Sequence, residues 1–152
     1  MPWAPGWKER AIKQVLFKCE RCGRCCSEYK IMELFPRDLA RLQHHFHMSL
    51  AQVMLTFCAE HPTAEGRWII NEWKPCKFYK NGCRIYNSRP IGCRFYPFLS
   101  GTSVLCRNTE IEVPDMDDSA LWMALARDTG LAVTEMMEYL KSIGAWVDDR
   151  ER

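Results

Sequence analysis

The sequence predicts a small α+β domain that is rich in cysteine and binds metal. Three observations lead to this prediction: eight of the nine cysteines follow a compact spacing, apolar residues recur at helical intervals, and one short segment has the pattern of a β-hairpin. The chain has 152 residues, 47% hydrophobic and 26% charged, which is the composition of one ordinary globular domain. We expect a single domain over 1–152, with a cysteine-cluster core at 19–106 and a C-terminal helical extension at 107–152.

The cysteine spacing is the strongest functional signal in the chain. The first group reads Cys-x2-Cys-x2-Cys-Cys, and the second reads Cys-x6-Cys-x9-Cys-x12-Cys. Four thiolates complete one structural zinc site or hold one cubane iron–sulfur cluster, so eight thiolates can supply two such sites. The predicted metal ligands are Cys19, Cys22, Cys25, Cys26, Cys76, Cys83, Cys93 and Cys106.

The expected compartment favours metal over disulfides. The first 17 residues contain no apolar stretch of the length that a secretory signal needs, so we expect a cytoplasmic protein. In a reducing compartment, closely spaced cysteines are metal ligands or redox groups more often than structural disulfides. The longest uncharged stretch, residues 43–59, contains three histidines and is too polar to span a membrane. We therefore expect no contact with a membrane.

Helical patterns lie on both sides of the first cysteine group. Residues 8–18 form a short amphipathic segment that leads into Cys19. Pro36 fits the first position of a second helix, which has an acid in its first turn. The sequence SLAQ at residues 49–52 matches a capping box, and the helix that it begins is expected to run to about Glu60. The two cysteine groups are thus separated by a two-helix insert.

Several possible ligands in the insert are left out of the site. Cys58 is expected on the second insert helix, where an unpaired cysteine beside Met and Phe is a small buried hydrophobic side chain more often than a ligand. His44, His45 and His47 could form a separate metal patch, since His44 and His47 lie three residues apart on a helix, but an exposed helix end is the simpler interpretation. His61, which precedes a proline, is expected to mark a helix end.

The second cysteine group is predicted to lie on rigid, turn-rich structure. Residues 68–70 are β-branched or aromatic, and Asn81-Gly82 separates two segments as the turn of a short β-hairpin would. This hairpin would fix the separation of Cys76 and Cys83. Prolines follow both Arg89 and Tyr96, which forces extended or turn geometry on those residues and holds Cys93 stiffly between them.

Two C-terminal helices are predicted after the last cysteine. An acidic loop at 114–118 is followed by helical patterns at about 119–128 and 133–142, which are separated by Thr129-Gly130. The Leu, Met and Trp residues of these segments are expected to face a core, because a stripe of such residues at helical spacing is usually packing rather than a cofactor site.

The segments CERCGRCC and PCKFYKNGCRIYNSRPIGCRFYPF resemble the YkgJ-like cysteine-cluster proteins, the CxxCxxCC family of zinc- or iron-chelating domains. The resemblance covers about residues 19–106, including the insert, and leaves the N-terminal arm and the C-terminal helices outside. It implies a metal-binding role for the same eight cysteines, although the family pattern is looser at Cys106. The biochemical role of the family is largely undefined, so no reaction follows from the resemblance.

Zinc and iron–sulfur both remain open, and the spacing favours iron–sulfur, most simply a 4Fe-4S cluster. The first three cysteines have the spacing of bacterial ferredoxin ligands, but Tyr29 stands where the fourth ferredoxin cysteine would be. A distant cysteine must then complete the site. Adjacent cysteines tend to point apart, which favours two centres. One division places Cys19, Cys22 and Cys25 with Cys93, and the other four cysteines, Cys26, Cys76, Cys83 and Cys106, together.

Basic residues surround both cysteine groups, where positive charge favours the thiolate form. They are Lys18, Arg21, Arg24, Arg84, Arg89, Arg94 and Arg107. Acidic residues nearly balance them, with a net charge of +2, so we do not predict a nucleic-acid partner. The sequence favours electron transfer or cluster handling with a redox or client protein. The alternatives are a structural zinc module for protein interaction and an accessory subunit or fragment of a metal-dependent modifying enzyme. No catalytic residue is predicted.

Overall fold

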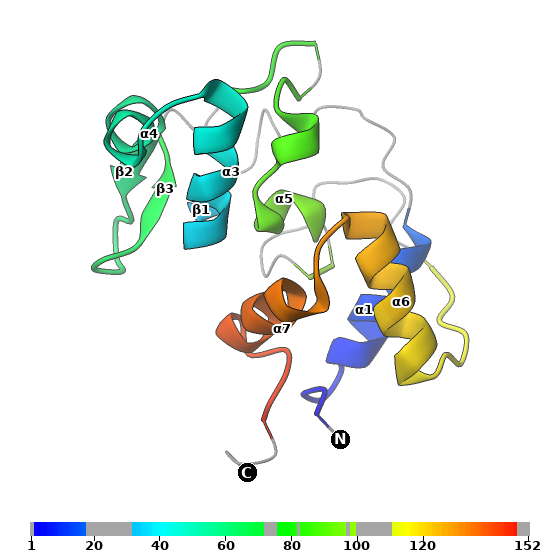
Figure 1. Cartoon of the computed structure of the whole chain (residues 1–152). Coiled ribbons are helices and arrows are strands. Elements are labelled where there is room, and N and C mark those ends of the chain that lie inside the picture. Colours follow the sequence, from blue (N-terminus) through cyan, green and yellow to red (C-terminus); the bar gives the residue numbers. More distant parts are fainter. Residues whose placement is uncertain are drawn as a thin grey trace. The chain divides into compact units, whose positions relative to one another are not determined.

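A computed structural model describes residues 2–17, 32–71, 76–81, 83–96, 98–99 and 111–148 (Figure 1). These residues contain six α-helices and a three-stranded antiparallel sheet, which confirms the predicted α+β class. Contacts divide the chain into two compact units. The central unit is Glu20–Arg94, and the terminal unit is Met1–Cys19 together with Phe95–Arg152. The expectation of one domain over 1–152 stays a prediction.

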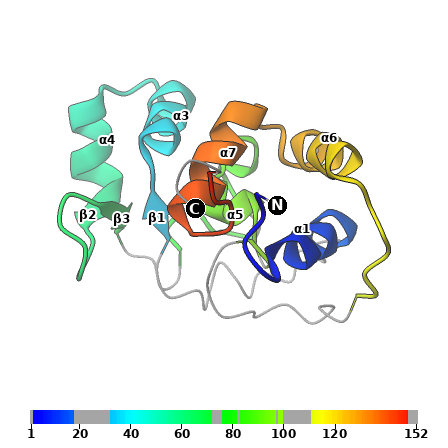
Figure 2. The ribbon, with the colours of Figure 1, turned by 90° about the horizontal axis from the view of Figure 1, so that it is seen from below.

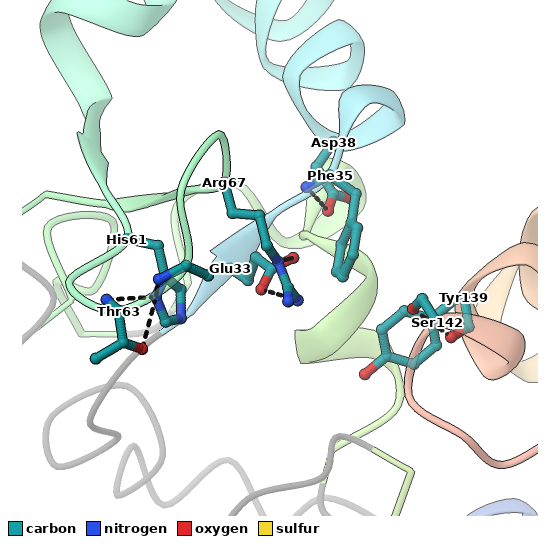
Figure 3. A network of polar contacts seen from close by, with 9 residues as sticks. Glu33, Phe35, Asp38, His61, Thr63, Arg67, Tyr139 and Ser142 are labelled. Carbon is teal, nitrogen blue, oxygen red and sulfur yellow. Dashed lines mark hydrogen bonds and ion pairs between the residues drawn. The ribbon is translucent and has the colours of Figure 1, made fainter.

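The sheet of the central unit is small, and both of its pairings are antiparallel. Its strands are β1 (Glu33–Leu34), β2 (Cys58–Glu60) and β3 (Trp68–Ile70), in the order β1-β3-β2. Glu33 pairs with Ile69 and Cys58 with Ile70. At the edge of this sheet the Arg67 guanidinium forms an ion pair with the Glu33 carboxylate (Figure 3). Residues 68–70 thus form a strand, as the sequence predicts, and it is the middle strand.

The two predicted insert helices are present as α3 (Pro36–Phe46) and α4 (Leu50–Phe57). Pro36 occupies the first helical position of α3, and His47 ends it in the left-handed conformation with φ 52°. The capping box of α4 is formed as predicted: Ser49 N donates to the Gln52 side chain (2.8 Å), and Gln52 N donates to Ser49 Oγ (3.1 Å). Figure 2 shows α3 and α4 side by side.

The predicted C-terminal end of α4 is wrong. The helix ends at Phe57, because Cys58 is extended with φ −114° and ψ 150° and begins β2. Pairing with β3 overrides the helical pattern of this segment. His61 therefore follows a strand and does not mark a helix end. Its Nδ1 accepts hydrogen bonds from the backbone N–H groups of Thr63 and Ala64, at 3.1 Å each, in the loop between β2 and β3 (Figure 3).

One apolar cluster forms the core of the central unit. Its aromatic members pack closely, with ring centroids of Phe46 and Phe57 4.7 Å apart and those of Phe57 and Phe78 5.1 Å apart. The buried members of the cluster are Leu34, Leu39, Leu42, Val53, Phe57, Ile70, Phe78 and Ile85. All of the described elements of the insert contribute to it, so the insert is folded onto the segment that carries the second cysteine group.

The terminal unit is built from the helices α1 (Trp7–Leu16), α6 (Asp118–Thr129) and α7 (Val133–Ser142). Asp117 caps α6 by accepting a hydrogen bond from Ala120 N (2.8 Å), and Gly130 ends it with φ 70°. These bounds confirm the two predicted C-terminal helices. Figure 2 shows α1 beside α6, where Lys8 and Asp118 form an ion pair of 2.8 Å. In the described ranges, no helix is long and apolar enough to cross a membrane.

Side chains from both ends of the chain meet in the terminal unit. Trp3 is buried and stacks on Trp122 at a centroid distance of 5.4 Å, and Trp146 packs edge-on against Trp3 at 5.1 Å. Backbone hydrogen bonds join Ala4 N to Ala145 O (2.8 Å) and Val147 N to Pro2 O (2.7 Å). Trp3 is therefore a core residue.

Candidate metal centre

The structure describes three of the eight predicted ligands. Cys76, Cys83 and Cys93 all belong to the central unit, and each is half-buried. The other five lie outside the described residues: Cys19, Cys22, Cys25, Cys26 and Cys106. The predicted division of the ligands into two centres depends on these five and stays a prediction.

A short turn links Cys76 to Cys83. Tyr79 N donates to Cys76 O (3.0 Å), and Tyr79 forms an antiparallel bridge with Cys83. Asn81 takes the left-handed conformation with φ 56°, as a residue in a tight turn can. The predicted hairpin is thus reduced, in its described residues, to a turn closed by one bridge. Both cysteines pack against the apolar cluster of the central unit.

Cys93 lies on a different element, the four-residue helix α5 (Ile91–Arg94). Its backbone N–H donates to Pro90 O (3.0 Å), and Ile91 and Gly92 before it are buried. Arg89, which precedes the proline, is extended with φ −56° and ψ 142°, as predicted. Cys93 therefore directly follows two buried residues, Ile91 and Gly92.

The sequence indicated an acid in the first turn of α3 but not its contact with α5. The Asp38 carboxylate accepts hydrogen bonds from Phe35 N (3.0 Å), Arg41 Nη2 (2.7 Å) and Ile91 N (2.8 Å). Burial raises the pKa of Asp38, and these three hydrogen bonds partly oppose that rise. Spacing carries no signal for a contact between residues 38 and 91.

Several of the basic residues near the second cysteine group have structural roles. Arg94 donates to Arg89 O (2.9 Å) and Asn87 O (3.1 Å), and the Arg89 guanidinium lies 3.9 Å from the centroid of the Tyr86 ring. Lys77 Nζ donates to Thr56 O (2.9 Å). Positively charged side chains are thus held by hydrogen bonds at the positions that follow Cys76 and Cys93 in the sequence.

Cys58 is at the start of β2 and not on the predicted helix, whereas His44 and His47 are placed as the sequence predicts. The Cys58 thiol is free, half-buried and packed against the apolar cluster, and burial raises its pKa while nearby Lys77 lowers it. His44 and His47 are exposed, with ring centroids 6.4 Å apart. These two residues form an exposed helix end.

Thiol donors fit both zinc and iron, which are bound by four thiolates in structural sites and clusters. Within the described residues, no three His, Cys, Asp or Glu side chains are grouped to hold a metal ion. Cys76, Cys83 and Cys93 thus do not make a metal site by themselves. The full ligand set of eight cysteines stays a prediction.

Comparison with known proteins identifies the family. The profile described as "CxxCxxCC: Putative zinc- or iron-chelating domain" matches residues 18–122. This range contains all eight predicted ligands, both insert helices and the first part of α6. No curated protein and no solved structure matches the chain. The chain belongs to the CxxCxxCC family, and metal binding is the property that this membership supports.

Proposed function

We propose that this protein holds an iron–sulfur cluster and acts in the cytoplasm in electron transfer or cluster handling, together with a redox or client protein. The observation that carries the proposal is the Cys-x2-Cys-x2-Cys spacing at residues 19–25, which ferredoxins also have. The family supports chelation of zinc or iron. The choice of a cluster, most simply 4Fe-4S, goes beyond the family and depends on this spacing.

The surroundings of the described cysteines suit such a role. Cys76 and Cys83 are half-buried, and they pack against a cluster that contains the buried rings of Phe57 and Phe78. Apolar walls limit the access of water to ligated sulfur, which tunes the reduction potential. Partial exposure of these cysteines keeps them near the surface, where a protein partner can exchange an electron.

Positively charged side chains next to the predicted ligands also suit a cluster. Lys77, next in sequence to Cys76, is held by Thr56 O and by the Asn71 side chain. Arg84, next to Cys83, is exposed, and its backbone N–H donates to Phe78 O (2.8 Å). When bound, a cluster would supply one-electron chemistry. The chain would supply thiolates, positive charge that stabilises the more negative reduced form, and apolar cover.

Purification under anaerobic conditions, followed by assays for iron, acid-labile sulfide and zinc, tests this proposal. We expect iron and sulfide in equal amounts and an electron paramagnetic resonance signal that appears on chemical reduction and disappears on reoxidation. Zinc without sulfide, in a protein that is silent to reduction, would overturn it. The control is the same preparation after removal of metal with a chelator.

A structural zinc protein is the second candidate, and the packing of the cysteines favours it. Cys76 and Cys83 contact the same cluster as Leu34 and Ile70 of the sheet, so ligation there would be coupled to folding of the central unit. Four-thiolate zinc leaves no position for substrate, which would make the protein an interaction module. The metal analysis above separates the two candidates.

A further inference from the structure

The Asp38 carboxylate joins two distant parts of the central unit. Its side chain is 1% exposed, and its two oxygens accept three hydrogen bonds. Oδ2 accepts from Phe35 N at the start of α3 (Figure 3), and Oδ1 accepts from Arg41 Nη2 and from Ile91 N. A carboxylate is buried only where it is compensated in this way. The bond to Ile91 spans 53 positions in the sequence.

The segment that donates this hydrogen bond, α5, is too short to be stable by itself. The helix α5 has four residues, which is far below the length at which an isolated helix is stable. Ile91 is its first residue, and a helix leaves its first N–H groups without intrahelical partners. Asp38 satisfies one of these groups from another element. A negative charge at this position also suits the helix dipole.

The insert contacts α5 at a second point. Gly92 is buried, and a Cβ built on it would lie 2.8 Å from Met32 Sδ, closer than real Cβ atoms approach. The Met32 backbone is held, because its carbonyl accepts a hydrogen bond from Ile70 N (3.0 Å). The two residues immediately before Cys93 therefore both contact the chain between the two cysteine groups, Ile91 through a hydrogen bond to Asp38 and Gly92 through close packing on the Met32 side chain.

We propose that Asp38 is a positioning residue for the predicted metal ligand Cys93. The carboxylate fixes the first turn of α5, and this turn sets where the Cys93 thiolate is presented. The two-helix insert then sets the position of one predicted ligand of the second cysteine group. This inference rests on the proposed metal-binding function, since it assigns a role in ligation to a residue that binds no metal itself.

The test compares Asp38→Ala, Asp38→Asn and Cys93→Ser with the unaltered full chain. Cobalt(II) is the probe, because its thiolate charge-transfer and ligand-field bands report the number and geometry of sulfur ligands. Hydrogen exchange of the Ile91 and Cys93 amides in the cobalt-loaded protein is the second readout. Asp117→Ala is the matched control, since it removes a capping aspartate from α6 in the terminal unit.

We expect Asp38→Ala to speed exchange of the Ile91 amide by about tenfold or more, as loss of a buried hydrogen bond does. Its cobalt spectrum should move toward that of Cys93→Ser. Asp38→Asn keeps an acceptor oxygen for Ile91 N but loses the ion pair with Arg41, so it should restore the spectrum in part. Asp117→Ala should leave the spectrum and the Ile91 amide unchanged.

The outcomes separate the inference from the function on which it rests. If Cys93→Ser alters the cobalt spectrum and a folded Asp38→Ala does not, Asp38 has no positioning role. If Cys93→Ser leaves the spectrum unchanged, Cys93 is no ligand and the inference also fails. If the unaltered chain binds no cobalt, zinc or iron, the proposed function itself is wrong.

A further variant keeps the inference testable if Asp38→Ala does not fold. Gly92→Ala places a Cβ 2.8 Å from Met32 Sδ without removing a buried charge, so the end of the Met32 side chain or α5 must shift. Where exchange of the Ile91 and Cys93 amides shows that α5 has moved, the cobalt spectrum should shift in the same direction as on loss of Cys93, with the fold retained by circular dichroism. Altered exchange of these amides with the unaltered spectrum would show that the geometry of α5 does not govern ligation.

Discussion

The central and terminal units differ in what stabilises their elements. The terminal unit contains α1, α6 and α7, which have 10 to 12 residues each, and local signals at Asp117 and Gly130 begin and end α6. Besides α3 and α4, the central unit contains strands of two or three residues and the four-residue α5. Such short elements depend on contacts from elsewhere in the chain. Six of the eight predicted ligands fall within the central unit, so metal should stabilise it most.

Loss of a predicted ligand should give the largest difference between the two units in the rate of amide exchange. Structural zinc sites contribute about 10–16 kcal/mol to the folding of small peptides. Cys76→Ser is therefore expected to lower metal content and to speed amide exchange of Ile70 in the central unit far more than that of Leu140 in the terminal unit. Metal analysis and exchange measured on the same samples check this.

Cys58→Ser is the control for that variant, because Cys58 packs against the same cluster and is not a predicted ligand. It should retain the metal. Unchanged metal content in Cys76→Ser would remove Cys76 from the ligand set. Equal acceleration of exchange in both units would show that they unfold together.

Truncation of a core side chain should have the next largest effect. Leu42 is fully buried in the cluster of the central unit, so Leu42→Ala is expected to lower the free energy of unfolding by about 2–5 kcal/mol. Leu55, also in the insert, is 86% exposed, and Leu55→Ala should change it by less than about 0.5 kcal/mol. Denaturant titration measures both. Similar losses for the two variants would contradict the assignment of the core.

Removal of a helix cap should have a smaller effect, confined to the terminal unit. Asp117→Ala deletes the acceptor for Ala120 N and should cost about 1 kcal/mol. The exposed Asp115 precedes the cap in the same loop, and Asp115→Ala should be neutral. Amide exchange in α6 is the measurement. Faster exchange in α3 of the Asp117→Ala protein would contradict the separate stabilisation of the units.

The smallest effect concerns the thiol of Cys58. Burial raises its pKa, so its reactive thiolate should form at higher pH than that of an exposed cysteine. Alkylation followed by peptide mass spectrometry should show this shift in the pH profile. Lys77→Met should shift the profile further upward, because Lys77 lowers the pKa, whereas Met at the exposed Lys80 should leave it in place. A profile like that of an unfolded peptide would refute the burial of Cys58.

The same difference between the units explains what the sequence could predict. The bounds of α6 and α7 follow from the apolar spacing, the Asp117 cap and Gly130, which are all local signals. The predicted end of α4 was wrong because residues 58–60 pair with β3, and no local pattern in the sequence indicates this pairing. The turn at Asn81 was correctly located, but in the described residues the segments on its two sides pair through the single bridge of Tyr79 and Cys83 and form no strands.

The candidate site was predicted in a similarly uneven way. The spacing of the cysteines identified the family, and three of the predicted ligands could be located on a turn and on α5. The role of Asp38 could not be predicted, because an acid near the start of a helix is a common cap. Only the fold brings its carboxylate within 2.8 Å of Ile91 N.

The indole cluster of Trp3, Trp122 and Trp146 provides a spectroscopic probe of the terminal unit. Its three rings lie with centroids 5.1 to 5.4 Å apart, close enough for their electronic transitions to couple. Their exciton-coupled circular dichroism should report the terminal unit, while thiolate-to-metal absorption at longer wavelength reports the cysteines. A single titration with a chelator could then reveal whether the terminal unit keeps its structure after the metal is removed.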